Sequence, residues 1–165
     1  MLGKVRVEKA REFMCQDGNS KASAKAEKLA YGEKTAKALT SCEAYLDKSI
    51  AALKSASEEL DSWTWHAAAE LEYALFLFSL RNADEDVTLK WRAESPDGSR
   101  SPAGLLNTVQ NLVVHSRESA ASGSWLQARK YAYAARSVLL RIQREYARRK
   151  RDLLRRSSSY SSSST

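Results

Sequence analysis

Residues 63–81, WTWHAAAELEYALFLFSLR, are the stretch that decides the fold. Between positions 67 and 80 it contains only two charged side chains, both glutamates, and its composition favours helix. Apolar side chains would lie on most sides of that helix, and a helix of this kind is usually the central one in a bundle. We therefore predict a central helix over 63–81, which Asp61 and Ser62 open.

A second segment repeats this one at an offset of 60 residues. The positions that match without gaps are Trp65, Ala68, Tyr73 and Ala74 with Trp125, Ala128, Tyr133 and Ala134. Each unit reads as a helix, a short polar turn and a Trp-xx-Ala helix, which together make an αα-hairpin. Two antiparallel hairpins form a four-helix bundle, so the repeat predicts an all-α fold. In each hairpin the alanine would allow close backbone approach and the tryptophan would close the end of the core.

The chain before this segment is also predicted to be helical. An accessory N-terminal helix over 5–16 would end at the turn 17–19 (Asp-Gly-Asn), where Ser20 is a suitable N-cap for the following helix. The pattern over 20–60 fits one long helix that Gly32 bends. It equally fits two helices, the second of which restarts at a capping box over residues 40–43.

After residue 81 the pattern predicts a long connection over 82–104, which is unusual in a compact domain. Part of it alternates apolar and polar residues like an extended arm, and the part that holds Pro96 and Pro102 is typical of a mobile turn. Further helices are expected over 105–121 and 125–156. Residues 1–156 are thus predicted to be a single helical-bundle domain, and the serine-rich tail 157–165 to be disordered.

The composition is that of an ordinary globular protein, with 43% apolar and 28% charged residues among 165. No window contains about 20 uninterrupted apolar residues, so we expect no membrane span, and the N-terminus lacks a secretory signal. Cytoplasmic residence is the corresponding prediction. Cys15 and Cys42 are expected to be buried thiols, and no spacing of Cys and His indicates a metal site or another cofactor.

Positive charge is concentrated at the end of the last predicted helix. Residues 140–156 (LRIQREYARRKRDLLRR) carry eight Lys or Arg and two acidic residues, so they account for +6 of the formal net charge of +7. Five of the arginines recur at steps of three and four residues and would form one continuous stripe on a helix. The candidate binding residues are these five, Arg141, Arg144, Arg148, Arg151 and Arg155, with Arg149, Lys150 and Arg156 in support.

An exposed stripe of this density repels itself unless an anion neutralises it, and arginine binds phosphate in bidentate fashion. We therefore predict a non-enzymatic, nucleic-acid-binding helical protein, with RNA as the expected ligand. No recognised RNA-binding or zinc-finger pattern is present, so little sequence specificity is expected. This interpretation requires that the guanidinium groups lack counterions within their own molecule.

Other interpretations of the basic helix remain open. The protein would be a scaffold or adaptor if the helix bound an acidic protein surface or completed a homo-oligomer. An anionic membrane surface and a helix that is merely solvated are further alternatives. The acidic clusters 58–61 and 84–86 lie at expected turns without His or Cys, so they are assigned to capping and solvation rather than to catalysis.

One short segment suggests an enzymatic alternative. Residues 110–115, QNLVVH, resemble the Arg-Asn-xxx-His motif of HEPN-type helical domains, many of which are RNA-cleaving toxins or defence nucleases. The resemblance covers six residues, and it implies either an RNase with His115 in its active site or an inactive relative. Gln110 stands where the motif has its arginine, which removes the cation that the chemistry would use beside the histidine.

Overall fold

The computed structural model describes residues 4–81 and 101–161, and the side chains of residues 23, 25–81 and 101–156. Within these ranges the chain forms helices and no strand, which confirms the predicted all-α class. The helices are α1 (Lys4–Lys54), α2 (Leu60–Arg81), α3 (Pro102–Ala121) and α4 (Trp125–Ser161).

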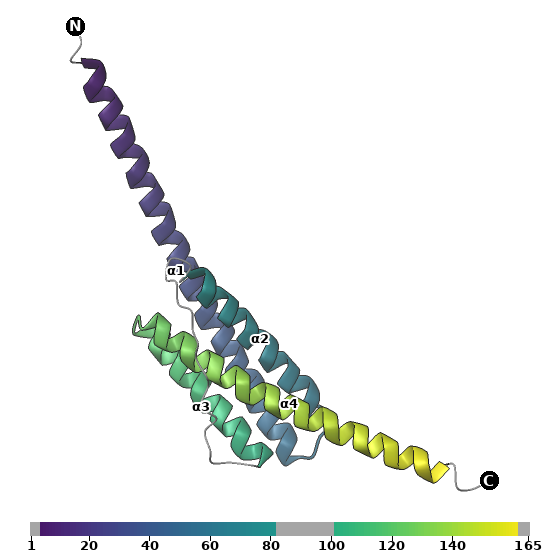
Figure 1. Ribbon diagram of the computed structural model, residues 1–165. Helices are drawn as coiled ribbons and strands as arrows, with labels where there is room; N and C mark the ends of the chain where they lie inside the picture. Colours follow the sequence, from purple (N-terminus) through teal and green to yellow (C-terminus); the bar gives the residue numbers. More distant parts are fainter. Residues whose placement is uncertain (1–3, 82–100, 162–165) are drawn as a thin grey trace.

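The four helices form a bundle in which every neighbouring pair is antiparallel (Figure 1). α1 packs on α2 and α3, and α4 packs on the same two helices, whereas the diagonal pairs α1/α4 and α2/α3 do not pack on each other in the described part. The predicted hairpins α1–α2 and α3–α4 are therefore confirmed. Contacts between them run from Gln143 to the carbonyl of Thr64 at 3.4 Å and from Arg117 to Glu43 at 2.8 Å.

The core is a single cluster of aliphatic and small side chains with one large aromatic residue, Phe78. Two hydrogen bonds join a small side chain of one helix directly to the backbone of the next. The Cys42 thiol donates to the carbonyl oxygen of Ala67 at 3.3 Å, and the Ser116 hydroxyl donates to that of Ala128 at 2.8 Å. Both alanines are fully buried, as expected where small residues allow close approach. The prediction of a buried thiol is confirmed for Cys42, and the side chain of Cys15 lies outside the described residues.

α1 is one continuous helix of 51 residues, so the choice left open over 20–60 resolves to one helix. The predicted accessory helix is wrong as a separate element, because α1 passes through residues 17–19 without a break. Gly32, which was predicted to bend this helix, has a packing role at the end of the bundle. A Cβ atom there would come within 3.2 Å of both Arg81 and the ring of Trp125.

Gly32, Arg81 and Trp125 close one end of the bundle together. The Arg81 guanidinium lies 3.7 Å from the centroid of the Trp125 ring and also donates to the carbonyl of Lys28. Burial against the ring lowers the pKa of Arg81 from its usual value. Trp125 thus closes the core as predicted, whereas its repeat partner Trp65 is 61% exposed, so the predicted role of Trp65 is wrong.

α3 begins earlier than expected. The Ser101 side chain caps it by accepting a hydrogen bond from the Gly104 amide at 3.1 Å, and Pro102 is its first residue. Proline is favoured at that position because its fixed φ suits a helix and its missing N–H would have no helical partner. Pro102 therefore opens α3 instead of lying in a turn. Residues 82–100, which hold the rest of the predicted connection, lie outside the described residues.

The ends of α1 and α4 extend beyond the bundle in opposite directions (Figure 1). The last core residue of α4 is Ile142, followed by the partly buried Tyr146, and all side chains from Ala147 to Arg156 are exposed. This confirms the predicted projecting helix. α4 continues to Ser161 instead of ending at Arg156, so it includes the first residues of the serine-rich tail.

Candidate nucleic-acid interface

The projecting end of α4 continues a segment that packs on the core along one side, and this row of core-facing side chains is the seam of α4. Its side chains in the core cluster recur at helical spacing and are those of Ala128, Ala132, Ala135, Val138, Leu139 and Ile142. The seam keeps one side of α4 on the bundle up to Tyr146, which packs against the core. Beyond that residue the helix continues without support from other described elements, so all of its sides face solvent.

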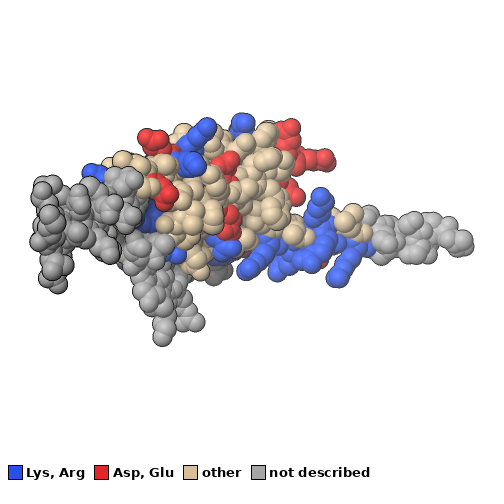
Figure 2. All heavy atoms as spheres, turned by 90° about the horizontal axis from the view of Figure 1, so that it is seen from above, with Lys and Arg blue, Asp and Glu red and all other residues tan. Residues whose placement is uncertain are grey.

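The predicted stripe lies on the opposite side of α4 from this seam. At about 100° per residue, the five arginines of the stripe centre about 180° away from the core-facing direction of Ala135, Leu139 and Ile142. All eight candidate residues are exposed, from Arg141 to Arg156. Figure 2 shows their Lys and Arg side chains gathered along the helix that leaves the bundle.

The cations of the projecting helix have few counterions in the described part of the chain. Arg141 pairs with Glu145 one turn later, at 3.3 Å between Nε and Oε1. Ion pairs to described carboxylates are absent for the residues Arg144, Arg148, Arg149, Lys150, Arg151 and Arg155. Among the described residues, the requirement for no internal counterion is therefore met for all six, four of which belong to the stripe, but not for Arg141.

The arginines of the bundle contrast with those of the projecting helix. Arg117 pairs with Glu43 across α3 and α1, and Arg136 pairs with Glu72 across α4 and α2. Burial raises the pKa of Glu43 from its usual value, while the charge of Arg117 acts in the opposite direction. Arginine is thus used to join helices within the bundle, whereas beyond Tyr146 it is left exposed.

Two local contacts order side chains at the base of the projecting helix. Arg149 lies over the Tyr146 ring, 5.8 Å from its centroid, and Arg151 donates from Nε to the carbonyl of Ala147 at 3.2 Å. Partial burial raises the pKa of Tyr146, and the nearby charge of Arg149 opposes that shift. These contacts involve a ring and a backbone carbonyl, so they leave the positive charges without neutralisation.

Acidic side chains lie at the same end of the bundle. Glu58, Glu59 and Asp61 are exposed at the α1–α2 turn, which is the end from which α4 projects because Gln143 contacts Thr64. Figure 2 shows acidic and basic side chains over the bundle, and basic ones gathered along the helix that projects from it. Negative charge therefore lies on the bundle beside the base of the projecting helix, and positive charge is concentrated along the helix itself.

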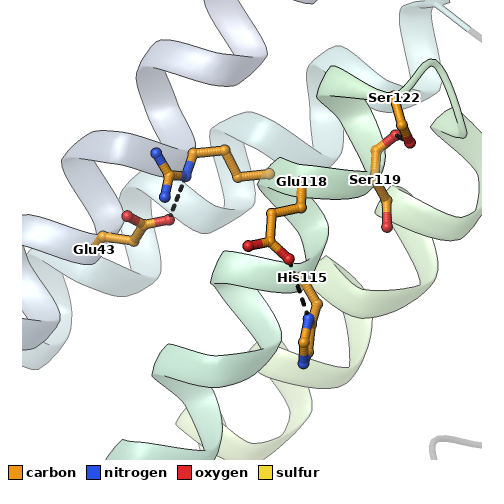
Figure 3. A network of polar contacts seen from close by, with 6 residues as sticks. Glu43, His115, Glu118, Ser119 and Ser122 are labelled. Atoms are coloured by element: carbon orange, nitrogen blue, oxygen red, sulfur yellow. Dashed lines mark hydrogen bonds and ion pairs between the residues drawn. The ribbon is translucent and has the colours of Figure 1, made fainter.

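The residues of the HEPN-like segment do not come together as an acid–base site in the described part of the chain. The Gln110 amide donates to Asp47 on α1, and Asn111 is exposed. The His115 imidazole is 57% exposed and lies 3.4 Å from Glu118 on the same helix (Figure 3). It also contacts the Tyr131 ring. The histidine is thus more exposed than a packing residue, and the nearest arginine of α3, Arg117, is bound to Glu43.

One surface was missed by reasoning from the sequence. α2 was expected to be central, but it occupies a corner of the bundle with one side facing solvent. Trp65, Tyr73, Phe76 and Leu80 are among the exposed large apolar residues, and they share that side. The signal was present in the apolar composition of 63–81, although the sequence does not say which side lacks a neighbour.

In the described ranges no helix is long and apolar enough to cross a membrane, and no group of three or more His, Cys, Asp or Glu side chains is placed to hold a metal ion. The chain matches no protein-family model, no curated protein and no solved structure.

Proposed function

We propose that this protein is a non-enzymatic nucleic-acid-binding protein that contacts phosphates through the Arg-rich end of α4, with RNA as its ligand. The observation that carries the proposal is the exposure of eight cations on one projecting helix, six of which form no ion pair with a described carboxylate. Guanidinium groups bind phosphate oxygens in bidentate geometry, as they also bind carboxylates.

The length of the stripe suits a polyanion better than a small anion. From Arg141 to Arg155 the helix rises by about 21 Å at 1.5 Å per residue. A double-stranded nucleic acid presents about 12 charges over that length, at one per 1.7 Å. Because the cations surround the helix after Tyr146, the helix can meet phosphates on more than one side.

The same residues predict binding without base readout. Asn and Gln, which recognise adenine edges, are absent from residues 144–156, and Gln143 is buried against Thr64. Contacts from Arg and Lys to phosphates position a nucleic acid but carry no sequence information. RNA helices are recognised mainly through their shape and backbone, which is the mode that such a helix supports.

The absence of enzymatic activity is part of the proposal. It is supported by the arrangement around His115, which is paired with a glutamate on its own helix, while Arg117 is held by Glu43. An RNase would show cleavage of RNA that is lost in His115→Ala. Intact RNA after prolonged incubation with the wild-type protein is the expected result.

Fluorescence anisotropy with labelled RNA and DNA over a salt series tests the proposal. We expect affinity to fall steeply and log-linearly with salt, because binding displaces counterions from the phosphates. Arg148→Glu/Arg151→Glu should abolish most of the binding. Any residual binding should have a salt slope smaller by about 1.8 on a duplex, at about 0.9 per lost contact, or by about 1.4 on a single strand, at about 0.7.

A matched control separates a local effect from the effect of net charge. Lys34→Glu/Lys37→Glu makes the same change in net charge at two exposed positions of α1, and it should bind almost as tightly as the wild type. Equal losses in both double variants would refute an interface on α4. Absence of RNA and DNA binding at low salt would refute the proposal and favour an acidic protein partner instead.

A further inference from the structure

The outward side of α2 carries an apolar stripe that the rest of the described bundle leaves uncovered. Its members are Trp65, Ala69, Tyr73, Phe76 and Leu80, and all five are exposed. They recur at steps of four, four, three and four residues, so they lie on one side of the helix. That side is opposite to the one through which Leu71, Ala74 and Phe78 enter the core.

Such a stripe is unusual on a surface helix. A helix with polar residues facing solvent needs only one apolar side, whereas a helix that is apolar all round is normally buried. Trp65 is 61% exposed, Phe76 56% and Tyr73 45%. Large exposed apolar patches on soluble proteins commonly mark interaction sites.

The order of residue sizes along the stripe suits α2 of a second copy of this chain as the partner. If α2 of a second copy packs antiparallel on α2, with a two-fold axis between residues 72 and 73, Trp65 lies opposite Leu80 and Ala69 lies opposite Phe76. The small side chain therefore meets the large one, as interdigitating helices require. A two-fold axis makes this match twice, because residue i contacts j and j contacts i.

We propose that α2 is a homodimer interface, on which α2 of a second copy packs antiparallel with its two-fold axis beside Tyr73. The charge near the axis permits this arrangement, because Glu72 is already neutralised by Arg136 of its own chain. Two copies therefore do not bring unpaired glutamates together at the axis.

The large aromatic side chains of the stripe supply less than half of the area of a stable interface. Fully covered aromatic side chains bury about 150–250 Å² each, so the exposed parts of Trp65, Tyr73 and Phe76 offer roughly 350 Å² per copy. Stable interfaces bury about 800 Å² per partner, so the flanks of α2 must contribute the remainder. Tyr73 beside the axis and Trp65 towards the end of the stripe are residue types that often dominate the binding energy of interfaces.

The first test is the oligomeric state of the nuclease-treated protein, measured by analytical ultracentrifugation over a wide concentration range. The wild type should be a dimer at high concentration, and Trp65→Gln/Phe76→Gln should weaken dimerisation at least tenfold. Leu153→Gln/Leu154→Gln is the matched control, because those leucines are 66% and 62% exposed on the projecting helix, and it should dimerise normally. Circular dichroism verifies that each variant is folded.

Disulfide cross-linking tests the antiparallel register. In a Cys15→Ser/Cys42→Ala background, Tyr73→Cys lies at the axis and should cross-link on oxidation. Trp65→Cys alone and Leu80→Cys alone should not, because the equivalent positions are about 22 Å apart at 1.5 Å per residue. A mixture of the two single variants should form the heterodimer. Cross-linking of both single variants would indicate parallel helices and overturn the register.

A monomer at all concentrations would overturn the proposal, as would dissociation by the Leu153→Gln/Leu154→Gln control alone. These measurements contain no nucleic acid, so their outcome is independent of the function proposed for the end of α4. Loss of RNA binding in the charge-reversed variant with an unchanged dimer, for example, would leave both proposals standing.

Discussion

Cys42 and Ser116 make the same kind of contact in the two hairpins. Each donates a hydrogen bond from its side chain to the carbonyl of a buried alanine on the following helix, Ala67 and Ala128 respectively. Larger residues at these four positions would force the helices apart, because packed interiors leave no room for extra volume. The spacing of the helices in each hairpin is thus set by single small side chains.

Burial raises the pKa of the Cys42 thiol to about 12, and the nearby charges of Glu43 and Glu70 act in the same direction. In the unfolded chain the thiol titrates near pH 8.5. The stabilisation is therefore complete below that pH, and it is lost as the pH rises towards 12, because only the unfolded chain gives up the proton in between. We expect the loss to approach 1.4 kcal/mol per pH unit.

Urea unfolding of Cys15→Ser and of Cys15→Ser/Cys42→Ala between pH 7 and pH 10 measures this contribution. The second protein lacks the buried thiol, so its free energy of unfolding should fall less steeply above pH 8.5. The difference in stability between the two proteins should consequently change with pH. A difference that stays constant over this range would show that the thiol does not titrate as its burial requires.

At the scale of the elements, helix type and pairing were predictable because they follow from hydrophobic spacing and turn residues. The continuity of α1 could not be predicted, because Asp17-Gly18-Asn19 is a strong local turn signal. A helix that is already formed gains one hydrogen bond for each added residue, whereas a single Gly costs only about 1 kcal/mol. A local turn signal is therefore insufficient to end a helix that continues on both sides.

The internal repeat predicted the hairpins but not the roles of individual residues. The buried positions of α2 recur in α4 at a shift of 61 residues, as Ala67 with Ala128 and Leu71 with Ala132, whereas identities match at 60. A shift of one residue turns a side chain by about 100° around the helix. Trp65 is consequently exposed although Trp125 is packed against the core.

The two hairpin turns end their first helices with the same backbone geometry but with different residues. Ala56 follows α1 with φ of +50°, and Gly123 follows α3 with φ of +82°. In each turn the next residue donates to a carbonyl five positions earlier, from Ser57 to Ala52 and from Ser124 to Ser119. Only glycine adopts such a φ without steric cost, so Ala56 is the strained member of the pair.

We therefore expect Ala56→Gly to raise the free energy of unfolding by about 1 kcal/mol. The left-handed conformation costs an L-residue about 1–2 kcal/mol, and relief of this cost is partly offset because glycine increases the entropy of the unfolded chain. Thermal or urea unfolding measures it. Gly123→Ala is the matched reversal. No atom lies within 4 Å of its added Cβ, so a loss of similar size would arise from the backbone alone. A stabilised Gly123→Ala would contradict this account.

At the scale of the whole molecule, the two surfaces differ in how far the sequence could reveal them. The cationic stripe was predictable because charge density and helical period are local properties of residues 140–156, and it is exposed as expected. The exposed apolar stripe of α2 could not be predicted, because its exposure depends on which sides of α2 the other three helices cover. The bundle thus has a polar surface at one end and an apolar one along a corner helix.

The two proposals together predict how affinity depends on the length of the RNA. α4 runs antiparallel to α2, so in an antiparallel α2 dimer the two projecting helices leave at opposite ends. An RNA that reaches both should bind at least about 100-fold more tightly than one that covers a single stripe, since the second contact becomes intramolecular. The variant Trp65→Gln/Phe76→Gln keeps every cation of the stripe, so it should bind short RNA with normal affinity. It should not bind long RNA more tightly than short RNA. Anisotropy with RNAs of increasing length measures both affinities. Equal length dependence in the wild type and this variant would show that the two stripes do not act together.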